Sequence, residues 1–209
     1  RKRSRMTRPD KILRLAFAVL FVAASAGCAT SFHPLPLDQV PFRDRAQTQE
    51  QNNVRATAVV LSAEETKKVF DLDLYKMGIQ PIWLEIENNT EGPIFFLPVG
   101  LDPEYFAPLE VAYMNHASFS GEANEQMDKF FHGHAMRSYI PKGEVRSGFV
   151  FTNMDLGTKS FNVDLVGKRG DRRFTFFVSV PGMKVSHQDV DWQNLYTKDK
   201  LVAYDDGED

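Results

Sequence analysis

Cysteine is almost absent from this sequence, since Cys28 is the only one among its 209 residues. A lone cysteine excludes an intramolecular disulfide and any zinc site built from several thiolates. Stability must therefore come from a hydrophobic core, and 17 Phe, six Tyr and two Trp supply the apolar area for one.

Motifs of known catalytic chemistry are also lacking. The sequence has no G-x-S-x-G nucleophile motif, no H-E-x-x-H zinc motif and no glycine-rich loop of the phosphate-binding kind. We therefore predict a protein that is not an enzyme, and we assign it neither catalytic residues nor a bound cofactor.

Positive charge is in the minority. The first 27 residues hold seven of the 25 Lys and Arg but one of the 28 Asp and Glu, so the chain from Cys28 onward has a net charge of −9. Nucleic acids and anionic lipid surfaces both select patches of Lys and Arg. The acidic balance argues against a nucleic-acid partner and against electrostatic adhesion to a membrane.

The apolar run near the N-terminus, residues 15–24, is shorter than the roughly 20 residues that a membrane-spanning helix needs. A basic stretch with Arg8, Lys11 and Arg14 precedes the run, and small residues lead from it to Cys28. This order of basic, apolar and small residues before a cysteine resembles the signal of bacterial lipoproteins.

The lipoprotein resemblance implies that residues 1–27 are removed and that Cys28 becomes the N-terminus, carrying diacylglycerol on its sulfur and a further acyl chain such as palmitate. In that family an Asp after the cysteine often retains the protein at the inner membrane. Ala29 stands there instead, which implies the periplasmic face of the outer membrane. Ser25 replaces the usual Leu, so an ordinary secretory signal cut near residues 24–26 is the alternative.

Composition divides the chain into four parts. Prolines and the polar stretch 47–53 predict a flexible tether ahead of a globular domain. We predict a lipoprotein signal peptide, a lipidated cysteine with a flexible tether, a β-sandwich domain, and a C-terminal extension with an acidic tail, over residues 1–27, 28–52, 53–182 and 183–209.

Short strands separated by turns dominate the predicted domain. Alternation is clearest over residues 81–88, where Ile82, Leu84 and Ile86 share one face and Trp83 lies on the other. Further strands are predicted over residues 54–61, 94–97, 108–114, 146–151, 159–166 and 173–180, with hairpins over 82–97 and 159–180.

Two short helices complete the predicted domain. Ser62 and Glu65 form a capping-box pattern ahead of a helix that ends near Phe70, and residues 122–132 are the best candidate for a second helix. The regular spacing of short strands and turns predicts a mainly β fold, an immunoglobulin-like antiparallel β-sandwich with one or two short helices.

Three stretches together resemble an uncharacterised envelope module of bacterial lipoproteins: residues 78–88, residues 96–106 with 108–110, and residues 146–153. In longer members this module precedes a domain called the LssY-like C-terminal domain. The resemblance covers about residues 40–206 and transfers no catalytic residue. It implies a lipid-anchored binding or assembly module of the cell envelope with a protein partner.

His132 and His134, with His116 nearby in sequence, form the one metal-like pattern. In an extended segment, imidazoles two residues apart point to one side and could share a Zn or Cu ion, with Glu110 or Asp128 as a third ligand. This leaves open a metal-binding envelope hydrolase or metallochaperone. The alternative is a helix C-terminus with histidines near its dipole.

Adjacent phenylalanines predict how the strands present their faces. Side chains alternate along a strand, so we expect one of Phe95 and Phe96, and one of Phe176 and Phe177, to lie on the outside. Several such exposed rings would form a partner-binding patch.

Asp102 opens a turn that mixes carboxylates with aromatic residues. Paired carboxylates can do acid–base chemistry, but an Asp-Pro turn explains the same residues more simply.

Overall fold

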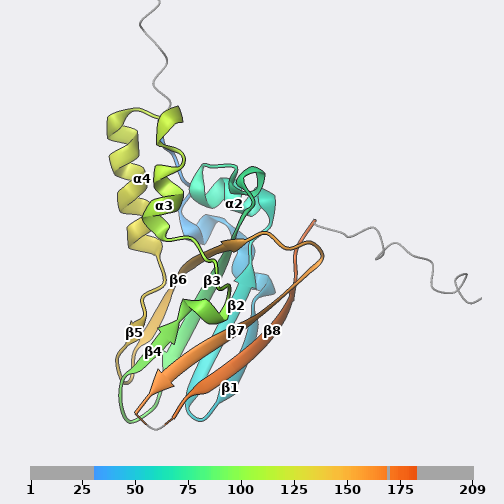
Figure 1. Cartoon of the computed structure of the whole chain (residues 1–209), viewed down its shortest axis with the longest axis vertical. Coiled ribbons are helices and arrows are strands. Elements are labelled where there is room, and N and C mark those ends of the chain that lie inside the picture. Colours follow the sequence, from blue (N-terminus) through green and yellow to red (C-terminus); the bar gives the residue numbers. More distant parts are fainter. Residues whose placement is uncertain (1–30, 169, 183–209) are drawn as a thin grey trace, which may run out of the picture.

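The computed structural model describes residues 31–168 and 170–182. In this part of the chain, eight strands form two four-stranded antiparallel sheets that stack as a sandwich (Figure 1). Sheet A has the order β1 (Gln47–Gln51), β2 (Val54–Val60), β3 (Ile79–Asn88), β6 (Val145–Asn153). Sheet B has the order β5 (Tyr139–Ile140), β4 (Ile94–Leu97), β7 (Thr158–Gly167), β8 (Arg172–Ser179). The predicted mainly β, antiparallel sandwich is confirmed.

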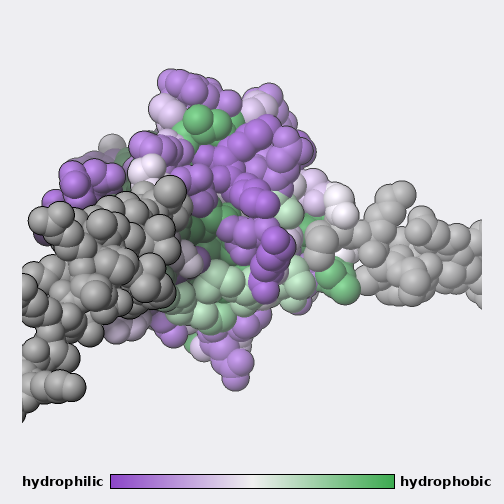
Figure 2. All heavy atoms as spheres, turned by 90° about the horizontal axis from the view of Figure 1, so that it is seen from above, coloured by the Kyte–Doolittle hydropathy of each residue, from purple (hydrophilic) through white to green (hydrophobic). Residues whose placement is uncertain are grey.

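Three short helices gather at one end of the sandwich (Figure 1). They are α2 (Ala63–Phe70), α3 (Pro108–Tyr113) and α4 (Gly121–His134). Five 3₁₀ turns lie between the elements: η1 (Leu37–Gln39), η2 (Pro41–Arg45), η3 (Leu74–Met77), η4 (Pro98–Gly100) and η5 (His116–Ser118). Seen from this end, the surface is mainly hydrophilic with smaller hydrophobic areas (Figure 2). None of the described helices combines the length and apolar character needed to cross a membrane.

Sheet A separates two hydrophobic cores. Ile82, Leu84 and Ile86 of β3 join the core between the two sheets, as their predicted common face requires. Trp83 lies on the opposite face and joins a second core with Phe149 of β6, its partner in the strand register. The sandwich therefore has three layers, with helices on one side of sheet A and sheet B on the other.

Helix α2 begins with the capping box that the sequence predicts. The N–H of Glu65 donates to the Ser62 hydroxyl (3.1 Å), and the Glu65 carboxylate accepts from the N–H of Ser62 (2.8 Å). The cap places Phe70 in the second core, where its ring centroid lies 5.0 Å from that of Phe149 and 5.1 Å from that of Phe131 in α4. The capping box thus fixes the start of helix α2, and Phe70 at the other end of this helix packs against both α4 and sheet A.

The strand predicted over residues 108–114 is wrong, because this stretch forms helix α3. Pro108 occupies the first helical turn, where its fixed φ suits a helix and its missing N–H costs nothing. Glu110 accepts a hydrogen bond from the N–H of Ala107 (3.1 Å), and Val111 packs in the second core. The second predicted helix, over residues 122–132, is confirmed within α4.

The described part of the predicted tether, residues 31–52, is packed rather than free. Phe42 is fully buried, and its ring centroid lies 6.0 Å from that of Trp83. Strand β1 then pairs with β2 in five registered positions. The tether prediction rested on the polar composition of this segment. Burial of Phe32, Val40 and Phe42 nevertheless packs the segment onto the domain.

The hairpin predicted over residues 82–97 is also wrong, although both of its strands exist. β3 already pairs with β2 and β6, so residues 89–93 carry the chain from sheet A to β4 in sheet B. We call residues 89–93 the crossover. The second predicted hairpin is confirmed as an antiparallel pairing, since β7 pairs with β8 over eight positions.

Asn88 holds the crossover in place from a fully buried position. Its side-chain amide donates to the carbonyls of Gly92 (2.9 Å), Ile140 (3.1 Å) and Pro141 (3.1 Å). Its side-chain oxygen accepts from the N–H (3.0 Å) and the hydroxyl (2.7 Å) of Thr90. One side chain therefore ties the end of β3 to the crossover and to the end of β5.

We predict that Asn88→Ala lowers the free energy of unfolding by about 2–4 kcal/mol, because it leaves several buried polar groups without partners. Urea unfolding measures the change. Asn89→Ala is the matched control, since this neighbouring side chain is exposed and bonds only Glu87 (2.8 Å). A loss no larger for Asn88→Ala than for Asn89→Ala would contradict the role given to Asn88.

Candidate functional site

The histidines of the predicted metal pattern do not share a centre. His132 and His134 lie in the last turn of α4, where residues two apart point in nearly opposite directions, not in an extended segment. His134 Nδ1 lies 2.9 Å from the carbonyl oxygen of Phe130, and the two rings pack with centroids 4.2 Å apart. A terminal nitrogen of Arg137 donates to His132 Nε2 (3.2 Å).

His116 has a separate partner. Its Nε2 lies 2.9 Å from the Asp128 carboxylate, and its ring packs beside Tyr113 with centroids 5.1 Å apart. Glu110, the other carboxylate considered as a ligand, caps helix α3 instead. Within residues 31–168 and 170–182, no group of three or more His, Cys, Asp or Glu is placed to hold a metal ion.

Asp102 fastens a loop to the end of β6. Its carboxylate accepts hydrogen bonds from the N–H of Asn153 (2.7 Å), the side-chain amide of Asn153 (3.0 Å) and the N–H of Glu104 (2.9 Å). Desolvation by partial burial raises its pKa, but these hydrogen bonds outweigh it and hold the pKa below the ordinary value of 3.8. The residue therefore acts as an ionised structural anchor, as the Asp-Pro turn suggests.

The phenylalanine pairs divide between inside and outside as alternation predicts. Phe96 and Phe176 are buried between the sheets, whereas Phe95 and Phe177 lie on the outer face of sheet B. Phe149 and Phe151 face the helices and belong to the second core. The outer face of sheet B thus carries aromatic rings that the cores do not use.

An apolar row crosses three strands on this outer face. Tyr139 pairs with Phe95, and Phe95 pairs with Val166, so the three side chains lie side by side. They are 52%, 46% and 38% exposed, and the rings of Tyr139 and Phe95 have centroids 5.4 Å apart. Leu97 and Val99 are exposed further along the same stretch of chain. We call Tyr139, Phe95 and Val166 the apolar row.

The two outer sheet faces differ in what covers them. The outer face of sheet A buries Trp83, Phe149 and Phe151 under the helices and the N-terminal segment. Helices α3 and α4 contact β6 of sheet A, whereas on sheet B the short turn η4 contacts β7. On the outer face of sheet B, by contrast, the apolar row and Phe177 remain exposed.

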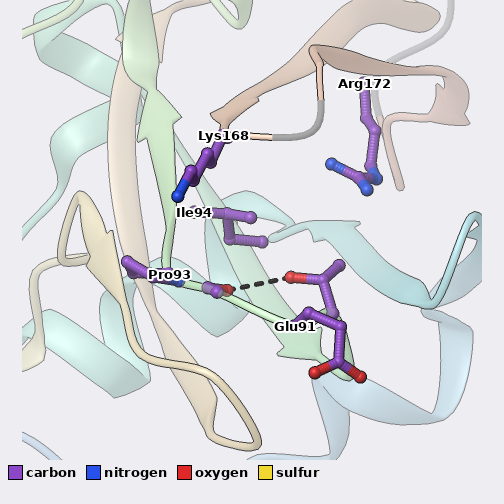
Figure 3. A pocket seen from close by; sticks show the side chains of 8 residues that line it. Glu91, Pro93, Ile94, Lys168 and Arg172 are labelled. Atoms are coloured by element: carbon purple, nitrogen blue, oxygen red, sulfur yellow. Dashed lines mark hydrogen bonds between the residues drawn. The ribbon is translucent and has the colours of Figure 1, made fainter.

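A pocket of about 300 Å³ lies at the end of the sandwich where the crossover faces the end of β7 and the start of β8. The crossover forms one wall, and Gly167, Lys168 and Arg172 of the β7–β8 pair form the other. Lys168 and Arg172 reach toward the crossover from two sides (Figure 3). Ile94, which neighbours Phe95, forms part of its lining.

Gly167 lets the end of β7 lie close to Ile94, beside Arg172. A Cβ at this position would lie 3.1 Å from a methyl carbon of Ile94 and 3.7 Å from a terminal nitrogen of Arg172. Arg172 pairs with the inward-facing Leu165 in the strand register, so it lies on the inner side of sheet B where the sandwich ends. The strand register therefore places the Arg172 guanidinium at the mouth of the core.

The apolar row follows from the phenylalanine pattern, but the pocket was missed by the sequence reasoning. The hairpin predicted over residues 159–180 was a usable signal, because Lys168 and Arg172 lie near the turn between its two strands. The pocket was not predicted because one of its walls is the crossover. The hairpin predicted over residues 82–97 would have kept β3 and β4 in one sheet, without a crossover to sheet B. Arg169, within that turn, lies outside the described residues.

Comparison with known proteins adds no family to this geometry. The chain matches no protein-family model and no curated protein.

We predict that Asp102→Asn destabilises the protein by about 1 kcal/mol at pH 7, because charge-assisted hydrogen bonds are stronger than neutral ones. The Asp102 pKa is lower in the folded state, so its stabilisation is complete above the ordinary value of 3.8 and is lost as pH falls through the folded value. Unfolding by urea at pH 7 and near pH 3 measures this. Glu104→Gln is the matched control, and an equal effect of the two variants at pH 7 would contradict the assignment.

Proposed function

We propose that this protein is a lipid-anchored, non-catalytic binding module of the bacterial cell envelope, and that it binds a partner protein through the outer face of sheet B. The apolar row is the observation that carries the proposal. Exposed apolar side chains are ordinary when scattered, but a contiguous set with aromatic rings is typical of an interaction site.

A protein partner is favoured over the membrane surface itself. From Cys28 onward the chain has a net charge of −9, and anionic lipids repel such a surface. In this proposal the lipid on Cys28 supplies membrane attachment, on the periplasmic face of the outer membrane, and leaves the sheet face for protein contact.

The finer fold assignment and the lipoprotein-module resemblance belong to the same proposal. Two antiparallel four-stranded sheets, with a crossover between them, support an immunoglobulin-like sandwich. A binding role is typical of such sandwiches, although a fold alone does not define a function.

We propose binding rather than metal-dependent hydrolysis or metal transfer. His116, His132 and His134 each contact a different partner, and these contacts give a structural role for each ring. No described contact brings the three imidazoles to a common point.

The anchor is tested by the mass of the N-terminal peptide purified from membranes of a Gram-negative host. We predict a diacylglycerol-modified Cys28 at the mature N-terminus, and loss of membrane association in Cys28→Ser. Two acyl signals together give firm attachment, because each buried CH₂ contributes about 0.8 kcal/mol. An unmodified Cys28 on a protein released with the periplasmic fraction would reject the anchor.

The binding face is tested by crosslinking in intact cells of the source bacterium. We predict that Phe95→Ser/Tyr139→Ser abolishes a discrete crosslinked complex that the parent protein forms, because it removes two exposed rings from the apolar row. Leu109→Ser/Tyr113→Ser is the matched control, since these residues are similarly exposed on α3.

Thermal unfolding of both double variants verifies that they remain folded. The proposal fails if the sheet variant forms the complex in the same yield as the control, or if the parent protein crosslinks only to lipid.

A further inference from the structure

Most cations in the described chain are paired with carboxylates. Salt bridges engage Arg45, Arg55, Lys67, Lys68, Lys76, Lys129, Lys142, Arg146, Lys159 and Arg173. Arg43 lies over the ring of Trp83, and Arg137 bonds His132. Lys168 and Arg172 are the remaining two, and neither has a carboxylate partner among the described residues. Both line the same pocket.

The guanidinium of Arg172 is incompletely satisfied. One terminal nitrogen donates to the carbonyl of Gly170 (3.2 Å), and Nε is shielded from solvent without a hydrogen-bond partner. A guanidinium has five N–H donors, so one bond to a carbonyl leaves most of its capacity unused. A shielded donor without a partner is costly, and an anion that accepts from the guanidinium would offset this cost.

The carboxylate nearest in the lining does not fill this need. Glu91 forms a salt bridge with Lys142 (2.8 Å), and its carboxylate is turned away from Lys168 and Arg172 (Figure 3). The hydroxyl of Thr90 bonds Asn88 (2.7 Å) and the carbonyl of Gly92 (2.9 Å). The two cations therefore face a space that no described anion occupies.

We propose that this pocket is an oxyanion site, in which Lys168 and Arg172 bind a phosphate or carboxylate group. Guanidinium groups bind the oxygens of such groups in pairs, and an ammonium adds a compact second charge. The volume of about 300 Å³ accommodates the group together with a small part of the molecule that carries it. The site depends on the pocket alone, so it stands or fails independently of the partner proposed for the apolar row.

Titration of the purified full chain with inorganic phosphate tests the site, with sodium chloride at matched ionic strength as the reference. Nitrogen–proton NMR follows the Arg172 Nε–H signal, which Arg172→Gln identifies by its loss. We expect a saturable shift of that signal, and roughly tenfold weaker binding for each cation removed, since a charged hydrogen bond is lost each time.

Lys168→Gln/Arg172→Gln is the test variant, and Lys129→Gln/Arg146→Gln is the control with the same change of charge on exposed, salt-bridged residues. Circular dichroism verifies the fold of both. Loss of saturable binding in the first variant only, for phosphate or for acetate, supports the site. A shift that does not saturate, or one that both variants lose or keep equally, overturns it.

Vesicles distinguish the source of the anion. In the Cys28→Ser background, which lacks the lipid anchor, binding to phosphatidylglycerol vesicles that needs Lys168 and Arg172, with none to phosphatidylcholine, supports a lipid headgroup as ligand. Saturable phosphate binding without vesicle binding supports a free anionic solute in the same site. Vesicle binding that the Lys168→Gln/Arg172→Gln variant retains, with no phosphate binding, overturns the site.

Discussion

Burial of sheet A on both faces is the constraint on which the rest of the structure depends. β3 places Leu84 in one core and Trp83 in the other, so neither face of this part of the strand can meet water without cost. Sheet B must cover one face, and the helices with the N-terminal segment must cover the other. Away from the helices, the outer face of sheet A carries polar groups such as the Arg55–Glu87 ion pair. Sheet B needs burial on its inner face alone, which leaves its outer face available for contact.

The same constraint determines where the pocket lies. Because β3 uses both edges for β2 and β6, the chain must cross to sheet B after Asn88, and the buried amide of Asn88 fixes that crossing. The crossover then faces the end of the β7–β8 pair, where Gly167 lies against Ile94 and Arg172 lines the pocket. As a result, Lys168 and Arg172, which have no carboxylate partner among the described residues, line the same pocket. The apolar row and the pocket therefore share one origin in the strand order.

Features of the fold that depend on neighbouring residues were predicted from the sequence. Features that depend on residues far apart along the chain were not. The Ser62–Glu65 capping box and the alternation around Trp83 depend on neighbouring residues, and both were predicted correctly. Pairing partners depend on residues far apart, so the hairpin over 82–97 was wrong. The strand prediction for residues 108–114 was wrong because the few apolar residues there suit a strand as well as a helix. The tether failed because β1 is a polar edge strand without period-two alternation. Predicting the pocket required the position of the crossover, and the hydrophobic pattern of the sequence does not give that position.

The central claim is that the apolar row is covered by a partner in the cell, and labelling of introduced thiols measures this most directly. Phe95→Cys and Thr48→Cys place a thiol on the apolar row and on an exposed position of β1, and the parent chain with Cys28 supplies the background. We expect a permeant maleimide to label Phe95→Cys several-fold more slowly in intact cells than in the purified protein, and Thr48→Cys at the same rate in both. Equal rates for Phe95→Cys in cells and in purified protein would contradict the account.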